Sequence, residues 1–182
     1  THDHADHCHG IDDLRPLRFG RNAPLPGFAS AATSRKLRSR FGYVFAGEYG
    51  YPTIVDLAVL EGWRIHAGFG VHALEMPHGP ITSTGYLFEA DGKTIGYTTD
   101  FGEITPAMVD LFRGVDILVT DCLRRHHHPT HATLAMALDF GARCGARRTV
   151  LSHLDASMDY ATLCDEIPPG FLVGYDGLEL DA

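Results

Sequence analysis

The sequence has no run of about eighteen apolar residues and no basic segment followed by an apolar leader. It therefore predicts neither a membrane span nor a signal peptide. Cysteine is also scarce, because the chain has 4 cysteines and no CxxC pair among them. Such spacing fits a reducing cytoplasm better than a disulfide framework. We therefore expect a cytoplasmic protein with no membrane partner, in which most cysteines are buried as small apolar residues.

Basic residues are also fewer than acidic residues. The chain has 15 Lys and Arg against 23 Asp and Glu, which gives a formal net charge of −8 at pH 7. No long block of like charge interrupts this balance, so the sequence lacks the basic surface with which proteins grip nucleic acid. We do not expect a nucleic-acid partner. A small anionic substrate would need local positive charge, most simply from cations held in a pocket.

The length and apolar content limit the number of domains. A chain of 182 residues that is 45% hydrophobic has enough apolar mass for one globular core. We expect a single domain over residues 1–182. From Thr99 onward, predicted strands alternate with predicted helices, which indicates the α/β class. A homodimer is the default expectation for a soluble enzyme.

Local signals predict the individual elements. Residues 20–60 have the pattern of an elaborated loop region that contains one helix over Ser30–Phe41, capped by Ser30. The expected strands are Thr53–Leu60, Trp63–Gly68, Gly85–Glu89, Thr94–Thr99, Val115–Thr120 and Thr149–Ser152, with a hairpin turn at Asp91-Gly92. Later helices are expected to open at Thr105-Pro106, at Thr133 and at Asp159, and two strand fragments are expected after Pro168-Pro169-Gly170.

The first ten residues, THDHADHCHG, contain four of the 12 histidines. His2, His4, Asp6 and His7 form the spacing H-x-H-x-D-H, and these ligand types can converge on one or two cations if the segment is a tight loop. The alternative is a histidine-rich tag remnant or a solvated tail. The tract is not a homopolymer, and apolar residues typical of a folded segment follow it, namely Ile11, Leu14 and Leu17.

The stretch THDHADH resembles the signature of the metallo-β-lactamase-fold hydrolases, and the following GIDDLRPL is similar to their phosphodiesterase branch. The resemblance implies an αββα sandwich of the α/β class. It also implies that His2 and His4 bind one metal ion, whereas Asp6 and His7 bind a second.

The same family requires three further ligands, each near the end of a strand. His78 in MPHG, Asp100 in YTTD and His153 in LSHL occupy the matching places, with Asp100 as the bridging ligand. His72 competes for the role of His78, but the family pattern is a histidine followed by glycine. The implied cofactors are two divalent metal ions, Zn²⁺ or Mn²⁺, with Fe²⁺ also compatible with these ligands.

A further motif, Pro129-Thr130-His131-Ala132-Thr133, resembles the H-x-T element of the branch that includes tRNase Z and the phosphoribosyl 1,2-cyclic phosphate phosphodiesterases. In those relatives the histidine lies near the scissile phosphate, so the resemblance implies a catalytic His131 that assists the departing oxygen. The purely structural alternative is that Thr133 caps the next helix and His131 is only its neighbour. The preceding His126, His127 and His128 are expected to form an exposed loop and not to be further ligands, with the alternative that one of them lines the mouth of the pocket.

These resemblances predict a dinuclear metal-dependent phosphodiesterase that acts on a small cyclic phosphodiester. Two cations roughly 3.5–4 Å apart, bridged by Asp100 and a water molecule, would supply a hydroxide and clamp the phosphate oxygens. Two alternatives stay open. One is a thioester or lactone hydrolase that uses the same metals, and the other is a metal-binding module without catalysis.

In the family, the signature follows a β-strand within the first half of the sandwich, whereas here Thr1 begins the signature itself. The resemblance therefore implies that the N-terminal strands of the sandwich are absent from these 182 residues. A chain that begins at Thr1 is expected to be poorly soluble or metal-deficient by itself.

Overall fold

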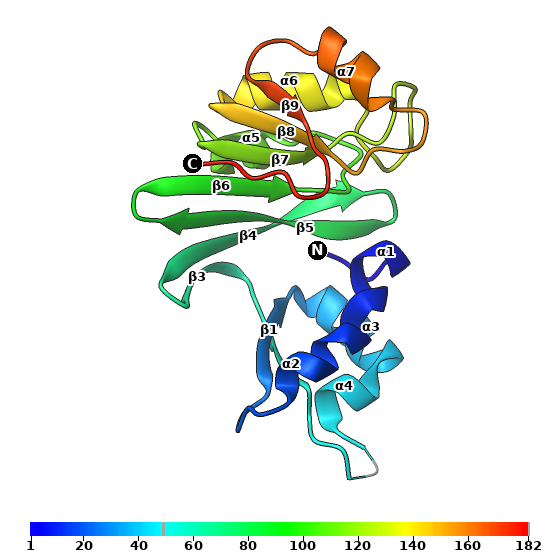
Figure 1. Cartoon of the computed structure of the whole chain (residues 1–182), viewed down its shortest axis with the longest axis vertical. Coiled ribbons are helices and arrows are strands. Elements are labelled where there is room, and N and C mark those ends of the chain that lie inside the picture. Colours follow the sequence, from blue (N-terminus) through cyan, green and yellow to red (C-terminus); the bar gives the residue numbers. More distant parts are fainter. Residues whose placement is uncertain (49, 182) are drawn as a thin grey trace. The chain divides into compact units, whose positions relative to one another are not determined.

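The computed structural model describes residues 1–48 and 50–181. The chain divides into two compact units, Thr1–Glu61 and Gly62–Ala182 (Figure 1). This division does not test whether residues 1–182 act as one domain, so the single domain stays a prediction. Among the described residues, no helix is long and apolar enough to cross a membrane.

The first unit combines short helices with one pair of strands. Its elements are α1 (Ala5–Cys8), the 3₁₀ helix η1 (His9–Leu14), α2 (Arg15–Arg18), β1 (Leu25–Ala29), α3 (Ala31–Arg40), α4 (Gly42–Ala46) and β2 (Val55–Val59). Strands β1 and β2 are parallel, with Leu25 opposite Val55. The prediction of a loop region over residues 20–60 was therefore wrong where β1 and α4 form. The predicted cap was right, because the Ser30 hydroxyl accepts a hydrogen bond from the Thr33 backbone N–H at 3.2 Å.

A small core holds this unit together. Val44, Phe45 and Ile54 are buried in it, and Ile11 and Leu14 pack against it. The segment after the opening histidines is therefore folded and contributes apolar surface to a core, unlike a tag remnant or a solvated tail.

The second unit contains a seven-stranded sheet in the order β3-β4-β5-β6-β7-β8-β9. Its strands are β3 (Gly62–His66), β4 (Phe69–His78), β5 (Ile81–Ala90), β6 (Lys93–Thr98), β7 (Ile117–Asp121), β8 (Arg148–Ser152) and β9 (Phe171–Val173). The pairings from β3 to β6 are antiparallel and those from β6 to β9 are parallel. Strand β4 was not predicted. Only one of the two expected terminal strands forms in the described chain, because the residues after Gly174 turn at Tyr175–Leu178 instead of forming a second strand.

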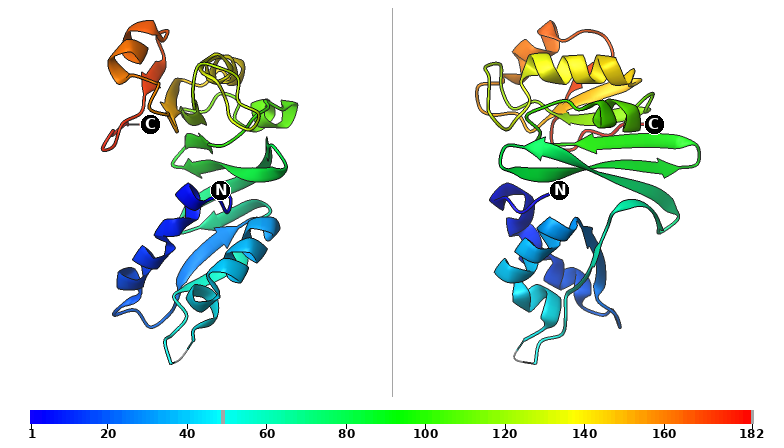
Figure 2. Two further views of the ribbon diagram at one scale, coloured as in Figure 1. Left: turned by 90° about the vertical axis from the view of Figure 1, so that its right-hand side faces the viewer. Right: turned by 180° about the vertical axis from the view of Figure 1, so that it is seen from behind.

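Three helices cover one face of this sheet, α5 (Pro106–Leu111), α6 (Leu134–Cys144) and α7 (Tyr160–Glu166) (Figure 2). Their N-terminal caps are Thr105, Thr133 and Asp159, as the sequence predicted. Under α5 and α6, Phe112 and Phe140 pack with Leu118 of β7. The opposite face carries a cavity of about 620 Å³ whose floor includes Ile95, Ile117, Val119 and Val150. The sheet thus has one face closed by helices and one apolar face lined in part by the C-terminal segment.

The parallel strands β6, β7 and β8 bring their carboxyl ends to one edge of the sheet. In open α/β sheets, ligands bind at this edge, where the strand ends leave side chains and backbone groups available. Asp100 follows β6, Asp121 ends β7, and His153 follows β8. The sheet topology therefore gathers ionisable side chains from three separate strands.

Candidate metal centre

Asp100 and His153 have an unusual backbone conformation. Among the described residues, four non-glycine residues have a positive φ angle, and two of them are Asp100 at 63° and His153 at 60°. This left-handed region costs an L-residue about 1–2 kcal/mol. Asp100 is also almost completely buried. Strained backbone at two predicted ligands indicates that the surrounding fold holds these side chains in place for a function.

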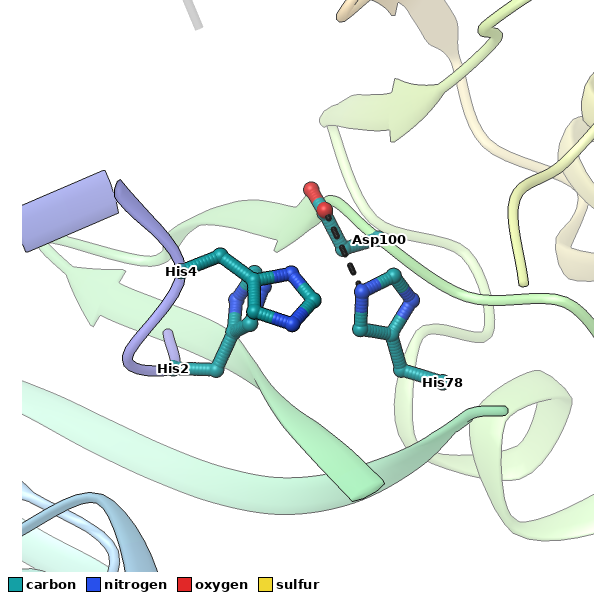
Figure 3. A group of neighbouring side chains, drawn as sticks. All are labelled: His2, His4, His78 and Asp100. Carbon is teal, nitrogen blue, oxygen red and sulfur yellow. Dashed lines mark ion pairs between the residues drawn. The ribbon is translucent and has the colours of Figure 1, made fainter. Parts of the chain in front are cut away.

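The Asp100 carboxylate lies at the centre of three imidazoles. Its Oδ2 atom is 3.7 Å from His78 Nε2 and 3.8 Å from His131 Nδ1, and its Oδ1 atom is 3.6 Å from His153 Nε2. Figure 3 shows the His78 ring turned toward the Asp100 carboxylate. The second unit thus brings together His78, Asp100 and His153, the three ligands predicted in it, and places the predicted catalytic His131 beside them.

These distances suit a metal ion. Two ligand atoms that are each about 2.0–2.2 Å from one ion are separated by roughly 3–4 Å, which is the spacing found around Asp100. Asp100 lies 3.7 Å from Nε2 of His78 and 3.6 Å from Nε2 of His153, so these three predicted ligands can share one ion. Imidazole nitrogen with carboxylate oxygen is a donor set for Zn²⁺, Mn²⁺ or Fe²⁺. The residues present therefore fit a divalent cation.

His78 is oriented by a hydrogen bond on its other nitrogen. Its Nδ1 atom donates to the Thr130 carbonyl oxygen at 2.8 Å, and the ring is almost completely buried. A carbonyl accepts only, so Nδ1 carries a proton, and in the neutral ring the lone pair on Nε2 faces Asp100. Histidine ligands of metals are commonly oriented in this way. The competing His72 lies within β4, the strand that His78 ends, and its ring is 6.2 Å from that of Trp63.

Asp121 is a functional candidate that the sequence analysis missed. Its Oδ2 atom accepts hydrogen bonds from Ala132 N at 3.0 Å and Phe101 N at 3.3 Å, and it lies 3.1 Å from His131 Nδ1. Because this oxygen accepts from backbone N–H groups, His131 must donate to it through Nδ1. Nε2 is then the nitrogen of His131 that can exchange a proton with a substrate. The sequence signal that could have identified it is an aspartate directly after the apolar predicted strand Val115–Thr120.

His131 is surrounded by other imidazoles. Its ring is stacked on that of His153 at a centroid distance of 5.0 Å, and it lies edge to face with His78 and His128, each at 4.9 Å. Thr133 caps α6 through a hydrogen bond from Met136 N. Both proposed roles of this motif are therefore compatible, since the capping threonine and the clustered histidine belong to the same turn.

The signature residues of the first unit gather around a single helical turn. The ring of His2 lies 4.4 Å from those of His4 and His7, and Thr1 Oγ1 is 3.0 Å from His2 Nδ1. Asp6 Oδ2 is 3.3 Å from His7 Nε2. Figure 3 also shows His2 and His4 side by side, just before α1. The segment is thus a loop leading into one turn of helix, and it converges three imidazoles within the unit.

Arg40 of α3 fixes this opening segment. Its guanidinium donates to the Asp3 carbonyl, lies 2.9 Å from His9 Nε2, and is 3.6 Å from the Asp3 carboxylate. The conformation of the signature is therefore supported from within the first unit.

A sequence-family profile described as the beta-lactamase superfamily domain matches residues 1–154. The chain belongs to the beta-lactamase superfamily. The profile covers both the opening signature and His153, so the predicted metallo-β-lactamase fold and its mixed α/β architecture are confirmed.

Solved structures refine the placement of this superfamily chain. A diphosphatase from the PhnP family is similar with a TM-score of 0.88 and 32% identity, covering 99% of this chain and 68% of that one. Human tRNase Z, short form, has a TM-score of 0.68 at 19% identity, covering 98% and 75%. Zinc-bound PqqB from Methylobacterium extorquens has a TM-score of 0.71 at 20% identity, covering 98% and 68%. The last two show the fold alone. The likeness to the PhnP-family diphosphatase is the one that matches the predicted branch of the superfamily.

Two curated relatives are much longer than this superfamily chain. An octanoyltransferase from Porphyromonas gingivalis is 31% identical over 189 residues, which cover 98% of this chain and 36% of the relative. Ribonuclease J from Thermus thermophilus is 26% identical over 110 residues, which cover 60% of this chain and 19% of the relative. The chain thus spans about a third or less of the curated proteins that it matches.

Proposed function

We propose that this chain is a metal-dependent hydrolase of small phosphodiesters. The observation that carries the proposal is the strained, buried Asp100 at φ 63°, whose carboxylate faces His78, His131 and His153. The proposed ligands of two divalent ions, Zn²⁺ or Mn²⁺ with Fe²⁺ as a third option, are His2, His4, Asp6, His7, His78, Asp100 and His153. The family signature supports the joint use of all seven.

Divalent ions bound there would activate a water molecule and neutralise the negative charge of the phosphate. The chain itself has a net charge of −8, so the ions would supply the positive charge that an anionic substrate needs. The chain's own residues set the geometry. His78 is oriented by Thr130, and Asp100 is held by its backbone and by burial. Both are thereby placed before substrate arrives, so little reorganisation is needed during the reaction.

His131 is proposed as the general acid. Its Nδ1 atom donates a hydrogen bond to Asp121. When Nε2 is also protonated, it can give its proton to the leaving oxygen of the substrate. Such proton transfer contributes about 10²–10⁴-fold to rate in enzymes that use it.

The proposed substrate class is small phosphodiesters, cyclic ones included. A second candidate is the phosphoanhydride bond of a diphosphate, because a relative at 32% identity is named a diphosphatase. Both reactions break a phosphorus–oxygen bond and place negative charge on a leaving oxygen. A homodimer, a cytoplasmic location and the absence of nucleic-acid and membrane partners remain predictions.

The test compares three substrates with the full chain reconstituted with Mn²⁺ or Zn²⁺. The substrates are bis(p-nitrophenyl) phosphate, a dinucleoside diphosphate and an acyl thioester, with Asp100→Asn as the background. We expect turnover of at least one phosphorus substrate that Asp100→Asn loses. Turnover of the thioester alone would support the thioester hydrolase instead. Bound metal without any turnover would support a non-catalytic metal-binding module.

A further inference from the structure

Three consecutive histidines precede the Pro129-Thr130-His131 turn, and the structure separates their roles. His126 and His127 are exposed, as predicted, and their carbonyl oxygens accept hydrogen bonds from Arg124 at 3.3 and 2.8 Å. Arg124 therefore fixes the backbone of this loop without using the two imidazoles. His128 differs because it is only partly exposed, unlike the two histidines before it.

The His128 imidazole closes the turn that leads to His131. Its Nδ1 atom accepts a hydrogen bond from the Thr130 backbone N–H at 3.3 Å and lies 3.3 Å from Thr130 Oγ1. Its ring is 4.9 Å from that of His131, at an interplanar angle of 63°. An accepting Nδ1 requires the neutral ring with its proton on Nε2. Burial, with His131 and Arg124 nearby, lowers the pKa of His128, which favours this neutral form.

Two glycines, Gly79 and Gly102, pack closely against the same turn. A Cβ atom on Gly79 would lie 2.4 Å from Thr130 Cγ2, and one on Gly102 would lie 2.9 Å from the Pro129 carbonyl oxygen. The Thr130 carbonyl oxygen accepts the hydrogen bond from His78. The turn is thus confined by two glycines and linked to a proposed metal ligand, and His128 adds a hydrogen bond to Thr130.

We propose that His128 is a positioning residue for His131, distinct from its two neighbours His126 and His127. By bonding Thr130 and packing edge to face on the His131 ring, it restricts that ring to the orientation in which Nδ1 meets Asp121. His131 then presents Nε2 to the leaving oxygen. This inference rests on the proposed function for its kinetic consequence, although the orientation of His131 can be measured without turnover.

The kinetic test compares two diesters with different leaving groups. Bis(p-nitrophenyl) phosphate releases a stable phenolate and needs little proton donation, whereas diphenyl phosphate releases a more basic one. We expect His128→Ala to lower kcat for diphenyl phosphate by about tenfold or more, with a smaller effect on the nitrophenyl substrate and unchanged metal content. The matched control His127→Ala should stay within about twofold of the wild type for both substrates. An equal loss for both substrates in His128→Ala would overturn the proposal.

Conservative variants separate the two nitrogens of His128. Asparagine places a carbonyl oxygen near the position of Nδ1, so His128→Asn should restore most of the lost kcat by accepting from Thr130. Glutamine places its amide near Nε2. Rescue by His128→Gln but not by His128→Asn would mean that Nε2 contacts substrate directly, which contradicts a positioning role. Thermal unfolding of each variant identifies those that do not fold.

A second readout does not depend on activity. In the metal-stripped chain, ¹⁵N NMR of the His131 ring should report a proton on Nδ1, as the hydrogen bond to Asp121 requires. In His128→Ala we expect a mixture of His131 tautomers, with the proton on either ring nitrogen. In His128→Asn and in the control His127→Ala we expect the wild-type spectrum. An unchanged His131 spectrum in folded His128→Ala would overturn the positioning role. If the wild type hydrolyses neither diester, the phosphodiester assignment fails and this spectrum still decides the inference.

Discussion

Asp121 accepts a hydrogen bond from His131 across 3.1 Å, and the same carboxylate oxygen also accepts from the backbone of Phe101 and Ala132. One atom therefore joins three segments, which follow β6, end β7 and precede α6. This arrangement determines which nitrogen of His131 carries its proton in the resting protein. A substitution at Asp121 should therefore slow proton transfer from His131 before it affects other steps.

Asp121→Asn should therefore impair substrates with basic leaving groups. The amide retains the shape of the side chain but weakens the acceptor that holds His131, so we expect kcat for diphenyl phosphate to fall by about a hundredfold. The loss for bis(p-nitrophenyl) phosphate should be smaller. Steady-state kinetics with both diesters checks this, with the exposed Asp139→Asn as a control. Equal losses for the two substrates would contradict the role of Asp121.

Gly79→Ala should destabilise the second unit through two separate effects. At φ 62° an added Cβ is strained, and it would also lie 2.4 Å from Thr130 Cγ2. Gly92 has a similar φ of 73° but no atom within 4 Å of the added Cβ, so Gly92→Ala isolates the backbone effect. We expect Gly92→Ala to lower the free energy of unfolding by about 1 kcal/mol and Gly79→Ala by about 2–3 kcal/mol. Urea unfolding measures both, and equal losses would show that the Thr130 contact is unimportant.

The cysteines should differ sharply in reactivity. Burial raises the pKa of Cys122 and of Cys144 to about 12, and Cys8 is also buried with a raised pKa, whereas Cys164 is exposed. Only the thiolate reacts, so a disulfide reagent at mildly alkaline pH should modify one thiol quickly in the native chain and four after denaturation. Fast reaction of a second native thiol would disagree with this burial.

The same pKa shifts predict how stability changes with pH. The folded chain keeps the protons of Cys122 and Cys144 up to about pH 12, whereas an unfolded chain releases them near the ordinary value of 9.0. Their contribution to stability is therefore complete below pH 9.0 and falls as the pH rises from 9.0 toward 12. Replacing both by alanine should flatten this alkaline decrease in the urea midpoint. An unchanged slope would show that other groups cause it.

Metal removal should lower the thermal stability of the chain. A ligand that binds only the folded state stabilises it by mass action, and Asp100 with its histidines is assembled only on folding. We expect chelation to lower Tm by about 5–10 °C in the wild type. Asp100→Ala should remove most of that difference. A Tm that does not respond to chelation would contradict the proposed ligand set.

Local signals predicted much of the fold correctly. Ser30, Thr105, Thr133 and Asp159 cap helices as expected, because a capping side chain bonds a backbone N–H only three residues away. Strand β1 was missed because Pro26 and Gly27 interrupt the usual strand pattern. That strand pairs only with β2 among the described residues, and an edge position tolerates proline. Strand β4 was missed because its buried and exposed residues do not alternate regularly.

The site could be predicted only as far as its motifs extend. The order of His78, Asp100 and His153 followed from the family resemblance, and each lies at the strand end that the resemblance implied. Asp121 and His128 carry no such motif. Their importance arises from contacts with Phe101, Ala132 and the His131 ring, which depend on how distant strands and a turn pack together. Such contacts require the three-dimensional structure.

The most direct test of the account is titration of the metal-stripped chain with Mn²⁺ or Zn²⁺ while hydrolysis of bis(p-nitrophenyl) phosphate is followed. We expect no turnover in the stripped chain, recovery on metal addition with a plateau at about two ions per chain, and no recovery in Asp100→Asn. Full turnover without metal, or full turnover by Asp100→Asn, would contradict it.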